Sequence, residues 1–170
     1  LVSQFLSPKH NIRTDAWGGT PENRRRFVLA VYQSMRDAVG PDFPIGIKLN
    51  SADFQRGGFT EEESLATIQA LAAVGIDLVE ISGGTYEAPA MAGKKTSTVE
   101  REAYFLEFAE KVRQHISTPL MVTGGFRTLS AMGAALSSGA MDVVGLGRPL
   151  CIEPDASKRL LAGEETRHRV

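Results

Sequence analysis

The feature that most restricts the fold is a regular alternation of strand-like and helix-like segments. Short apolar runs typical of buried strands occupy residues 44–50, 77–82, 119–123 and 142–147. Helical patterns lie before the first run and after each of the four, at about residues 20–40, 60–75, 104–115, 129–138 and 154–163. Strands that alternate with helices form parallel sheets with right-handed crossovers, so the pattern predicts an α/β fold.

Local signals set several helix boundaries. Thr20 and Pro21 suit the start of the first helix, and Thr60 with Glu63 has the spacing of a capping box. The segment before Thr20 is rich in Ser, Pro, Asn and Gly and is expected to be irregular. The basic run at residues 24–26 lies beside Glu22, and we interpret it as a solvated helix face.

Two architectures fit this alternation. One is an open sheet with helices on both faces, and the other is part of a (β/α)8 barrel, which usually needs about 250 residues. The chain has 170 residues, and it contains neither a dinucleotide-binding glycine pattern after its first strand nor a Walker loop. The residues suited to chemistry lie after the last two strands, where many barrels bind a phosphate. We therefore expect a partial (β/α)8 TIM barrel.

Those residues predict a phosphate-binding pair of loops. Gly124 and Gly125 follow one strand, and Gly147 and Arg148 follow the next. Glycines let backbone N–H groups approach a dianion, a following helix N-terminus adds positive potential, and an arginine holds two phosphate oxygens. The alternative is that these are turn glycines and a surface arginine. The occurrence of both motifs on consecutive strands favours the phosphate site.

A long segment near the N-terminus resembles the Old Yellow Enzyme family of NADH:flavin oxidoreductases. Residues 4–27 follow the family pattern QFLSP, then N-x-R-x-D-x-Y/W-G-G-S/T-x-E-N-R-x-R-F. The matching residues are Gln4, Phe5, Leu6, Ser7, Pro8, Asn11, Arg13, Asp15, Gly18, Gly19, Glu22, Asn23, Arg24 and Phe27. The later segments PIGIKLN, VEISGG, VTGGF and GLGRPL fall in the family's order. The resemblance implies one domain over residues 1–170 that forms strands five to eight of the barrel with their helices.

The resemblance also implies a cofactor and a reaction. The family binds FMN and transfers hydride from NADH or NADPH through the flavin to an activated alkene. Its phosphate position corresponds to Gly124, Gly125, Gly147 and Arg148. A cation beside the flavin pyrimidine corresponds to Lys48, where the family usually has arginine, and Tyr86 is a candidate pocket or proton-donating residue. The family's substrate-orienting His/His or His/Asn pair lies before the segment that resembles this chain, so we expect the chain to lack it.

Composition bears on partners and location. The formal net charge of -1 favours neither nucleic acid nor an anionic membrane, and no apolar run reaches the roughly 18 residues of a membrane span. The single cysteine, Cys151, cannot form an internal disulfide, a four-cysteine zinc site or an iron–sulfur cluster. We expect no metal and a cytoplasmic location; the N-terminus does not have the pattern of a signal peptide.

Three functional hypotheses remain open from the sequence. The first is an FMN-dependent ene-reductase present as a partial barrel, and the second is another phosphate-binding TIM-barrel protein. The third is a non-catalytic half barrel. A four-stranded half barrel exposes two strand edges, so we expect a homo-oligomer or association with a missing N-terminal half.

Overall fold

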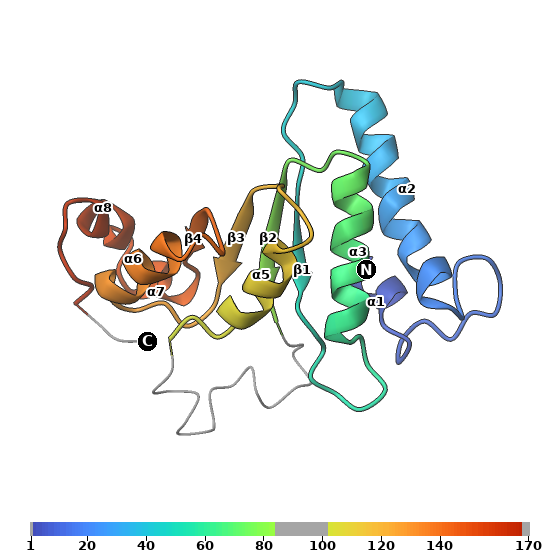
Figure 1. The fold of residues 1–170 in the computed structure, drawn as a ribbon, viewed down its shortest axis with the longest axis horizontal. Coiled ribbons are helices and arrows are strands. Elements are labelled where there is room, and N and C mark those ends of the chain that lie inside the picture. Colours follow the sequence, from blue (N-terminus) through green and yellow to red (C-terminus); the bar gives the residue numbers. More distant parts are fainter. Residues whose placement is uncertain (1, 84–101, 168–170) are drawn as a thin grey trace.

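The structure, a computed structural model, describes residues 2–83 and 102–167. Its four strands are all parallel and lie in the sheet order β1-β2-β3-β4 (Figure 1). Their bounds are β1 Gly46–Asn50, β2 Leu78–Ser82, β3 Leu120–Thr123 and β4 Val143–Gly145. The predicted α/β class and the four predicted strands are therefore confirmed, and the observed strands are shorter than the predicted runs.

The helices match the predicted order, with two additions. Their bounds are α1 Val2–Leu6, α2 Pro21–Val39, α3 Glu61–Ala73, α5 Leu106–Arg113, α6 Leu129–Ser137, α7 Arg148–Ile152 and α8 Ala156–Leu161. Helix α1 lies in the segment that was expected to be irregular, and α7 was not predicted. Each of these two helices has five residues, which is too short for a 3.6-residue hydrophobic period to be visible in the sequence.

The helix starts follow the capping signals. The Thr20 hydroxyl accepts a hydrogen bond of 3.3 Å from the Asn23 N–H at the start of α2. At the start of α3, Thr60 and Glu63 each bond the other's backbone N–H at 3.3 Å, so the predicted capping box is confirmed.

Arg24 corrects the interpretation of the basic run in α2. Arg26 is exposed and Arg25 is half-buried, but Arg24 is only 5% exposed. Arg24 shares the inner face of α2 with Val28 and Tyr32, which follow it at intervals of four residues. Its guanidinium donates to the Leu6 and Gly19 carbonyl oxygens and pairs with Glu63. The partners of Arg24 thus come from three separate segments, which the sequence pattern could not show.

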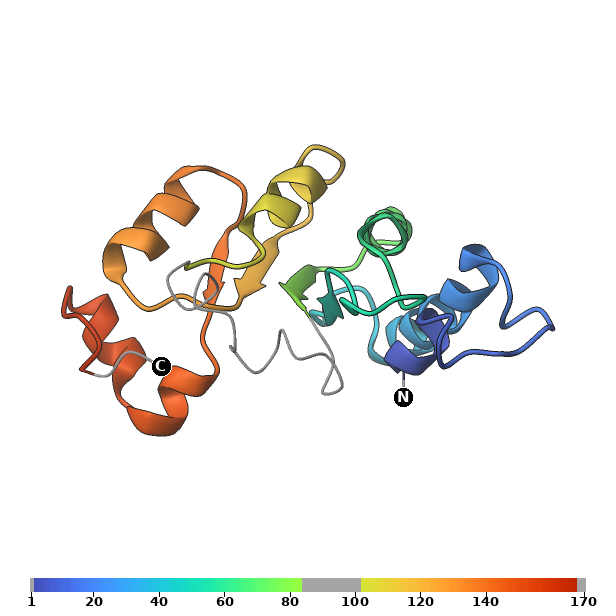
Figure 2. The same ribbon diagram turned by 90° about the horizontal axis from the view of Figure 1, so that it is seen from below.

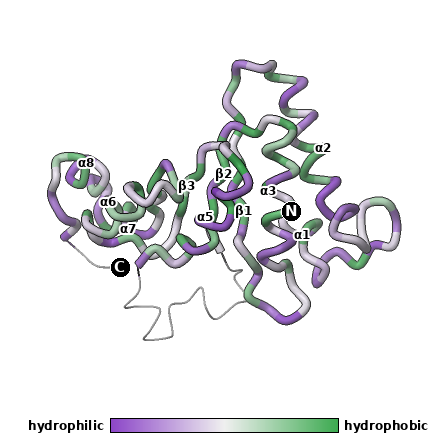
Figure 3. Tube along the Cα trace, in the orientation of Figure 1, coloured by the Kyte–Doolittle hydropathy of each residue, from purple (hydrophilic) through white to green (hydrophobic). Residues whose placement is uncertain are grey.

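The core lies between the sheet and the helices on one of its faces. Viewed from below, α3, α5 and α6 lie on the same side of the row of strands (Figure 2). Hydrophobic and hydrophilic residues alternate along α2, as expected of a helix with one buried and one exposed face (Figure 3). Val79 and Ile81 in β2 are fully buried toward the helices, while Glu80 between them points to the other face. We call that second face the open face of the sheet.

The amino ends of the strands carry a clasp that occurs twice. Asp77, just before β2, accepts a 2.7 Å bond from the Ile45 N–H and pairs with Arg36 of α2. Asp142, just before β4, accepts a 2.8 Å bond from the Leu120 N–H and pairs with Arg113 of α5. The two halves of the sheet therefore repeat one structural device, which ties each pair of strands to the helix before it.

Asp77 is expected to make stability depend on pH. The Ile45 N–H bond, followed by the Arg36 bond, holds the pKa of Asp77 below its ordinary value. A lowered folded-state pKa gives stability that is present above the ordinary value, about 3.9, and is lost as pH falls through the folded-state value. We expect Asp77→Asn to lower the urea midpoint at pH 7, with a difference from the unmodified chain that shrinks below about pH 4.

The matched control is Asp42→Asn, at an exposed position near the same end of the sheet. Its urea midpoint should follow that of the unmodified chain at every pH. A difference between the Asp77→Asn variant and the unmodified chain that stays constant from pH 7 to pH 3 would contradict the assignment.

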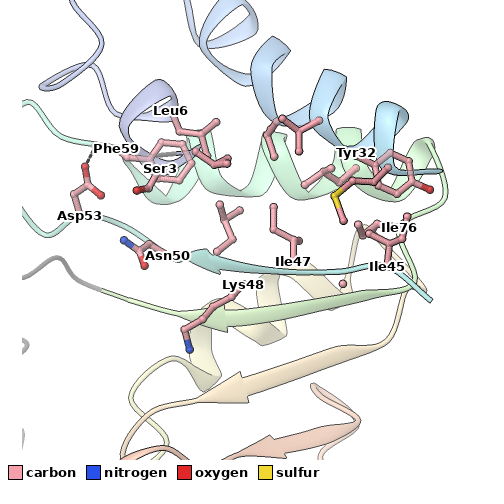
Figure 4. A pocket seen from close by; sticks show the side chains of 17 residues that line it. Ser3, Leu6, Tyr32, Ile45, Ile47, Lys48, Asn50, Asp53, Phe59 and Ile76 are labelled. Carbon is pink, nitrogen blue, oxygen red and sulfur yellow. Dashed lines mark hydrogen bonds between the residues drawn. The ribbon is translucent and has the colours of Figure 1, made fainter. Parts of the chain in front are cut away.

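The outer edges of the sheet are open in the part of the chain that the structure describes. There, β1 pairs only with β2, and β4 pairs only with β3. A groove of about 290 Å³ runs beside β1, between that strand and helices α1 and α2 (Figure 4). It is lined mainly by apolar side chains, among them Leu6, Val31, Met35, Ile47 and Leu71. No helix in the described ranges is long and apolar enough to cross a membrane.

Candidate functional site

Two loops meet at the carboxyl edge of the sheet. Strand β3 ends at Thr123 and β4 ends at Gly145, and these two residues are paired in the parallel register. The turn at 124–125 and the turn at 147–148 therefore leave the same edge of neighbouring strands. The phosphate site predicted from the sequence requires these two loops to lie side by side, and in the structure they do.

The glycines of the first loop have an additional reason to be glycine. Gly124 and Gly125 have φ values of +149° and +79°, a region of backbone conformation that residues other than glycine rarely adopt. A Cβ on Gly124 would lie 2.7 Å from the Phe105 ring, and one on Gly125 would lie 2.6 Å from the Tyr104 ring. The two aromatic rings thus pack directly against this loop.

The second loop carries an exposed arginine. Arg148 is the first residue of α7, is exposed, and pairs with no carboxylate within residues 2–83 and 102–167. Gly147 is the N-cap of α7, and space is open around its Cα. Arg127 in the first loop is different, because its guanidinium donates to the Tyr104 hydroxyl at 2.6 Å and lies 5.9 Å from that ring's centroid. Arg148 is therefore the arginine available to an anion here.

Helix α6, which follows the first loop, already carries carboxylates at its start. Glu102 accepts bonds of 2.9 and 3.1 Å from the N–H groups of Arg127 and Thr128. Glu165 accepts a 3.3 Å bond from the Leu129 N–H. These carboxylates satisfy donors that we had expected the helix N-terminus to offer to a phosphate. The donors for an anion are thus the turn at 124–125 and the 147–148 segment, and the role expected of α6 is corrected.

The open face carries three polar side chains from three consecutive strands. Lys48 of β1 pairs with Glu80 of β2, and the Thr123 hydroxyl of β3 donates to the same Glu80 oxygen, Oε1, at 2.7 Å. Lys48 points away from the helices that Ile47 faces (Figure 4). Glu80 is thus the charge partner of Lys48 on this face. The sequence signal that could have identified Glu80 is a charged residue between two apolar strand residues, Val79 and Ile81.

The loop after β1 completes this edge. Ser51 is 1% exposed, and its hydroxyl has no hydrogen-bond partner among the described residues. Asp53, which is also buried, accepts bonds from the Ser7 hydroxyl at 2.6 Å and from the Phe59 N–H at 2.9 Å. Phe54 has a φ of +54°, and its ring centroid lies 6.2 Å from that of Phe105. An unpartnered buried hydroxyl is a group that a bound polar ligand can satisfy.

These features fit the phosphate of a flavin nucleotide and the polar pyrimidine edge of its ring. The two neighbouring loops and Lys48 lie at or near one edge of the sheet. At the same edge, the Arg148 guanidinium has no carboxylate partner and the buried Ser51 hydroxyl has no hydrogen-bond partner among the described residues. Tyr86, the candidate pocket residue, lies outside the described residues.

Comparison with known proteins gives consistent matches. The model of the NADH:flavin oxidoreductase / NADH oxidase family matches residues 1–167. The NADH-dependent flavin oxidoreductase iccE of Talaromyces variabilis is 40% identical over 175 residues, which cover 97% of this chain and 42% of that protein.

Two solved structures illustrate the structural likeness. A complex of 2-naphthoyl-CoA reductase with 2-naphthoyl-CoA matches at a TM-score of 0.86 and 32% identity, over 96% of this chain and 25% of that one. Morphinone reductase matches at a TM-score of 0.74 and 27% identity, over 99% and 42%. The chain thus spans less than half the length of each of these proteins, and its four-stranded sheet matches a fragment of their fold.

Proposed function

This chain belongs to the NADH:flavin oxidoreductase / NADH oxidase family, and we propose on that basis that it forms the phosphate-binding end of an FMN-dependent oxidoreductase. In this proposal, β1 to β4 are strands five to eight of a (β/α)8 barrel. The parallel order β1-β2-β3-β4 supports the assignment, since the loops of the last two strands are those at which many barrels hold a phosphate. The domain then extends over residues 1–170.

The observation that carries the proposal is the pairing of Thr123 with Gly145. This register brings the Gly124–Gly125 turn beside Gly147 and Arg148. In our proposal the backbone N–H groups of these glycines and the Arg148 guanidinium hold the FMN phosphate. A planar guanidinium can donate to two phosphate oxygens. Glycines have no Cβ atom, so their backbone N–H groups can approach the phosphate closely.

Lys48 is proposed to lie beside the pyrimidine edge of the flavin. Its side chain is 56% exposed on the open face, which leaves the ammonium accessible to a ligand while it pairs with Glu80. A cation at this position stabilises the negative charge of the reduced flavin. Tyr86 is proposed as a residue that lines the substrate pocket, on the basis of the family resemblance alone.

The chemistry that FMN supplies when bound is two-electron transfer, with hydride taken from NADH or NADPH and delivered to an activated alkene. In this proposal, the residues of this chain hold the cofactor and stabilise the negative charge of its reduced form. The resemblance places the groups that orient the alkene carbonyl outside this segment. The alternative is a half barrel without turnover, and the observation that favours it is that the outer edges of β1 and β4 have no strand partner among the described residues. The cytoplasmic location expected from composition stays a prediction.

One assay tests the proposal. The purified chain is examined for flavin absorbance, then treated with NADH or NADPH and afterwards with cyclohexenone under low oxygen. Loss of the flavin absorbance with the nicotinamide and its return with the enone would support the oxidoreductase. A chain without affinity for FMN would support the non-catalytic half barrel, and a preference for a different phosphate ligand would support another phosphate-binding barrel.

The outer edges of β1 and β4, which have no strand partner among the described residues, lead to a prediction about association. An exposed strand edge beside an apolar groove favours pairing with another strand. We expect the 170-residue chain to form a homo-oligomer, or to associate with an N-terminal half barrel when one is supplied. Sedimentation velocity over a range of concentrations measures this, and a well-folded monomer at high concentration would contradict it.

A further inference from the structure

A chain of polar contacts crosses the open face from one strand to the next. Lys48 and Glu80 are opposite each other in the register of β1 and β2, and the Lys48 ammonium donates to Glu80 Oε1. The Thr123 hydroxyl donates to the same oxygen at 2.7 Å. One oxygen atom of Glu80 therefore accepts from both neighbouring strands, so its negative charge is shared between two donors.

The fourth strand is shaped to keep this arrangement. Gly145 is opposite Thr123 in the register of β3 and β4. A Cβ at position 145 would overlap the Thr123 Oγ1 atom, so the glycine leaves room for the rotamer that bonds Glu80. The contact between Thr123 and Glu80 thus depends on a residue from each of three strands.

The burial of the pair is unequal. The Glu80 side chain is 22% exposed and that of Lys48 is 56% exposed. A carboxylate that is largely buried loses part of its hydration, and the two donors replace some of the lost hydrogen bonds. The lysine keeps about half of its side-chain surface exposed, so it can contact a ligand on the open face without leaving Glu80.

We propose that Glu80 is a positioning residue that acts through Lys48 and sets how strongly this lysine favours reduced over oxidised FMN. The inference rests on the proposed function. As long as Glu80 accepts from the ammonium, part of the positive charge of Lys48 is neutralised and the lysine is held toward β2. Without the carboxylate, the ammonium is free to pair with the negative charge of the reduced flavin.

The experiment measures the dissociation constants of oxidised and reduced FMN for the full chain. Their ratio, oxidised over reduced, cancels any loss of binding that is common to both states. We expect the near-isosteric Glu80→Gln to raise this ratio about tenfold, which for a two-electron couple is a shift of about 30 mV in reduction potential. An unchanged ratio would overturn the inference, because a merely structural partner weakens both states alike.

Two further variants test whether Glu80 acts through Lys48 and whether the ratio changes in the expected direction. In a Lys48→Met background, Glu80→Gln should raise the ratio by less than about threefold, because the residue through which it acts is absent. An equal rise in both backgrounds would show a direct field effect and would overturn the assignment. Thr123→Val removes the second donor to Glu80 Oε1, so the full negative charge of that oxygen acts on Lys48, and the ratio should fall about two- to threefold.

The failure of this inference is distinguishable from the failure of the proposed function. If the unmodified chain binds no FMN in either state, the proposed function is overturned and the inference with it. If it binds FMN and the ratio does not respond to Glu80→Gln, only the role of Glu80 is overturned.

Discussion

Replacement of Arg24 by alanine is expected to lower the free energy of unfolding by about 3–5 kcal/mol, as the removal of one partner from a buried ion pair does. The Arg24 guanidinium is buried between α1, the loop before α2 and the start of α3. The substitution leaves the Leu6 carbonyl oxygen, the Gly19 carbonyl oxygen and the Glu63 carboxylate without this donor. Since the side chain of Glu63 is only 18% exposed, its charge is poorly compensated by water.

Arg26→Ala is the matched control, two residues further along the same helix. Arg26 is exposed and donates to the neighbouring Asn23 side chain at 3.2 Å. Its replacement should change the free energy of unfolding by no more than about 0.5 kcal/mol. Urea denaturation of the two variants measures the difference, and equal free energies of unfolding would show that the buried contacts of Arg24 carry no stability.

Replacement of Arg148 by methionine is expected to weaken FMN binding by about 10- to 100-fold, the range of one hydrogen bond between charged partners. Methionine keeps an unbranched apolar side chain at the start of α7 but removes the guanidinium. Arg148 is exposed and pairs with no carboxylate in the described part of the chain, so its loss should leave the fold intact. The affinity for riboflavin, which has no phosphate, should not change.

Lys158→Met supplies the control for this measurement. Lys158 is an exposed cation on α8, away from the two phosphate loops, and its replacement removes one positive charge from the chain as Arg148→Met does. Isothermal titration with FMN should show that only Arg148→Met weakens binding. Equal affinity of the Arg148→Met variant and the unmodified chain would remove Arg148 from the site.

The parts of the fold that were predicted correctly depend on local patterns. The strands were predictable because short apolar runs end in glycine or polar residues, and the start of α3 was predictable because Thr60 and Glu63 are three residues apart. The juxtaposition of the two loops also followed from order alone. Consecutive parallel strands joined by one short helix bring their carboxyl ends to one edge.

The parts that were missed depend on contacts between distant segments. Arg24 was interpreted as solvated because its neighbours in sequence are charged, although its spacing from Val28 and Tyr32 places it on the buried face. The partners of Glu102 are 25 and 26 residues away, so its place at the start of α6 had no local signal. In the same way, the pairing of Lys48 with Glu80 required the register of two strands that are 32 residues apart.

The most direct test of the account is a comparison of FMN and riboflavin binding to the unmodified chain. The two molecules differ only in the phosphate, which the Gly124–Gly125 turn and the 147–148 segment are proposed to hold. Because two or more charge-assisted hydrogen bonds are at stake, the account predicts that FMN binds at least about 100-fold more tightly than riboflavin. Equal affinities for the two would contradict the central claim that these neighbouring loops form a phosphate site.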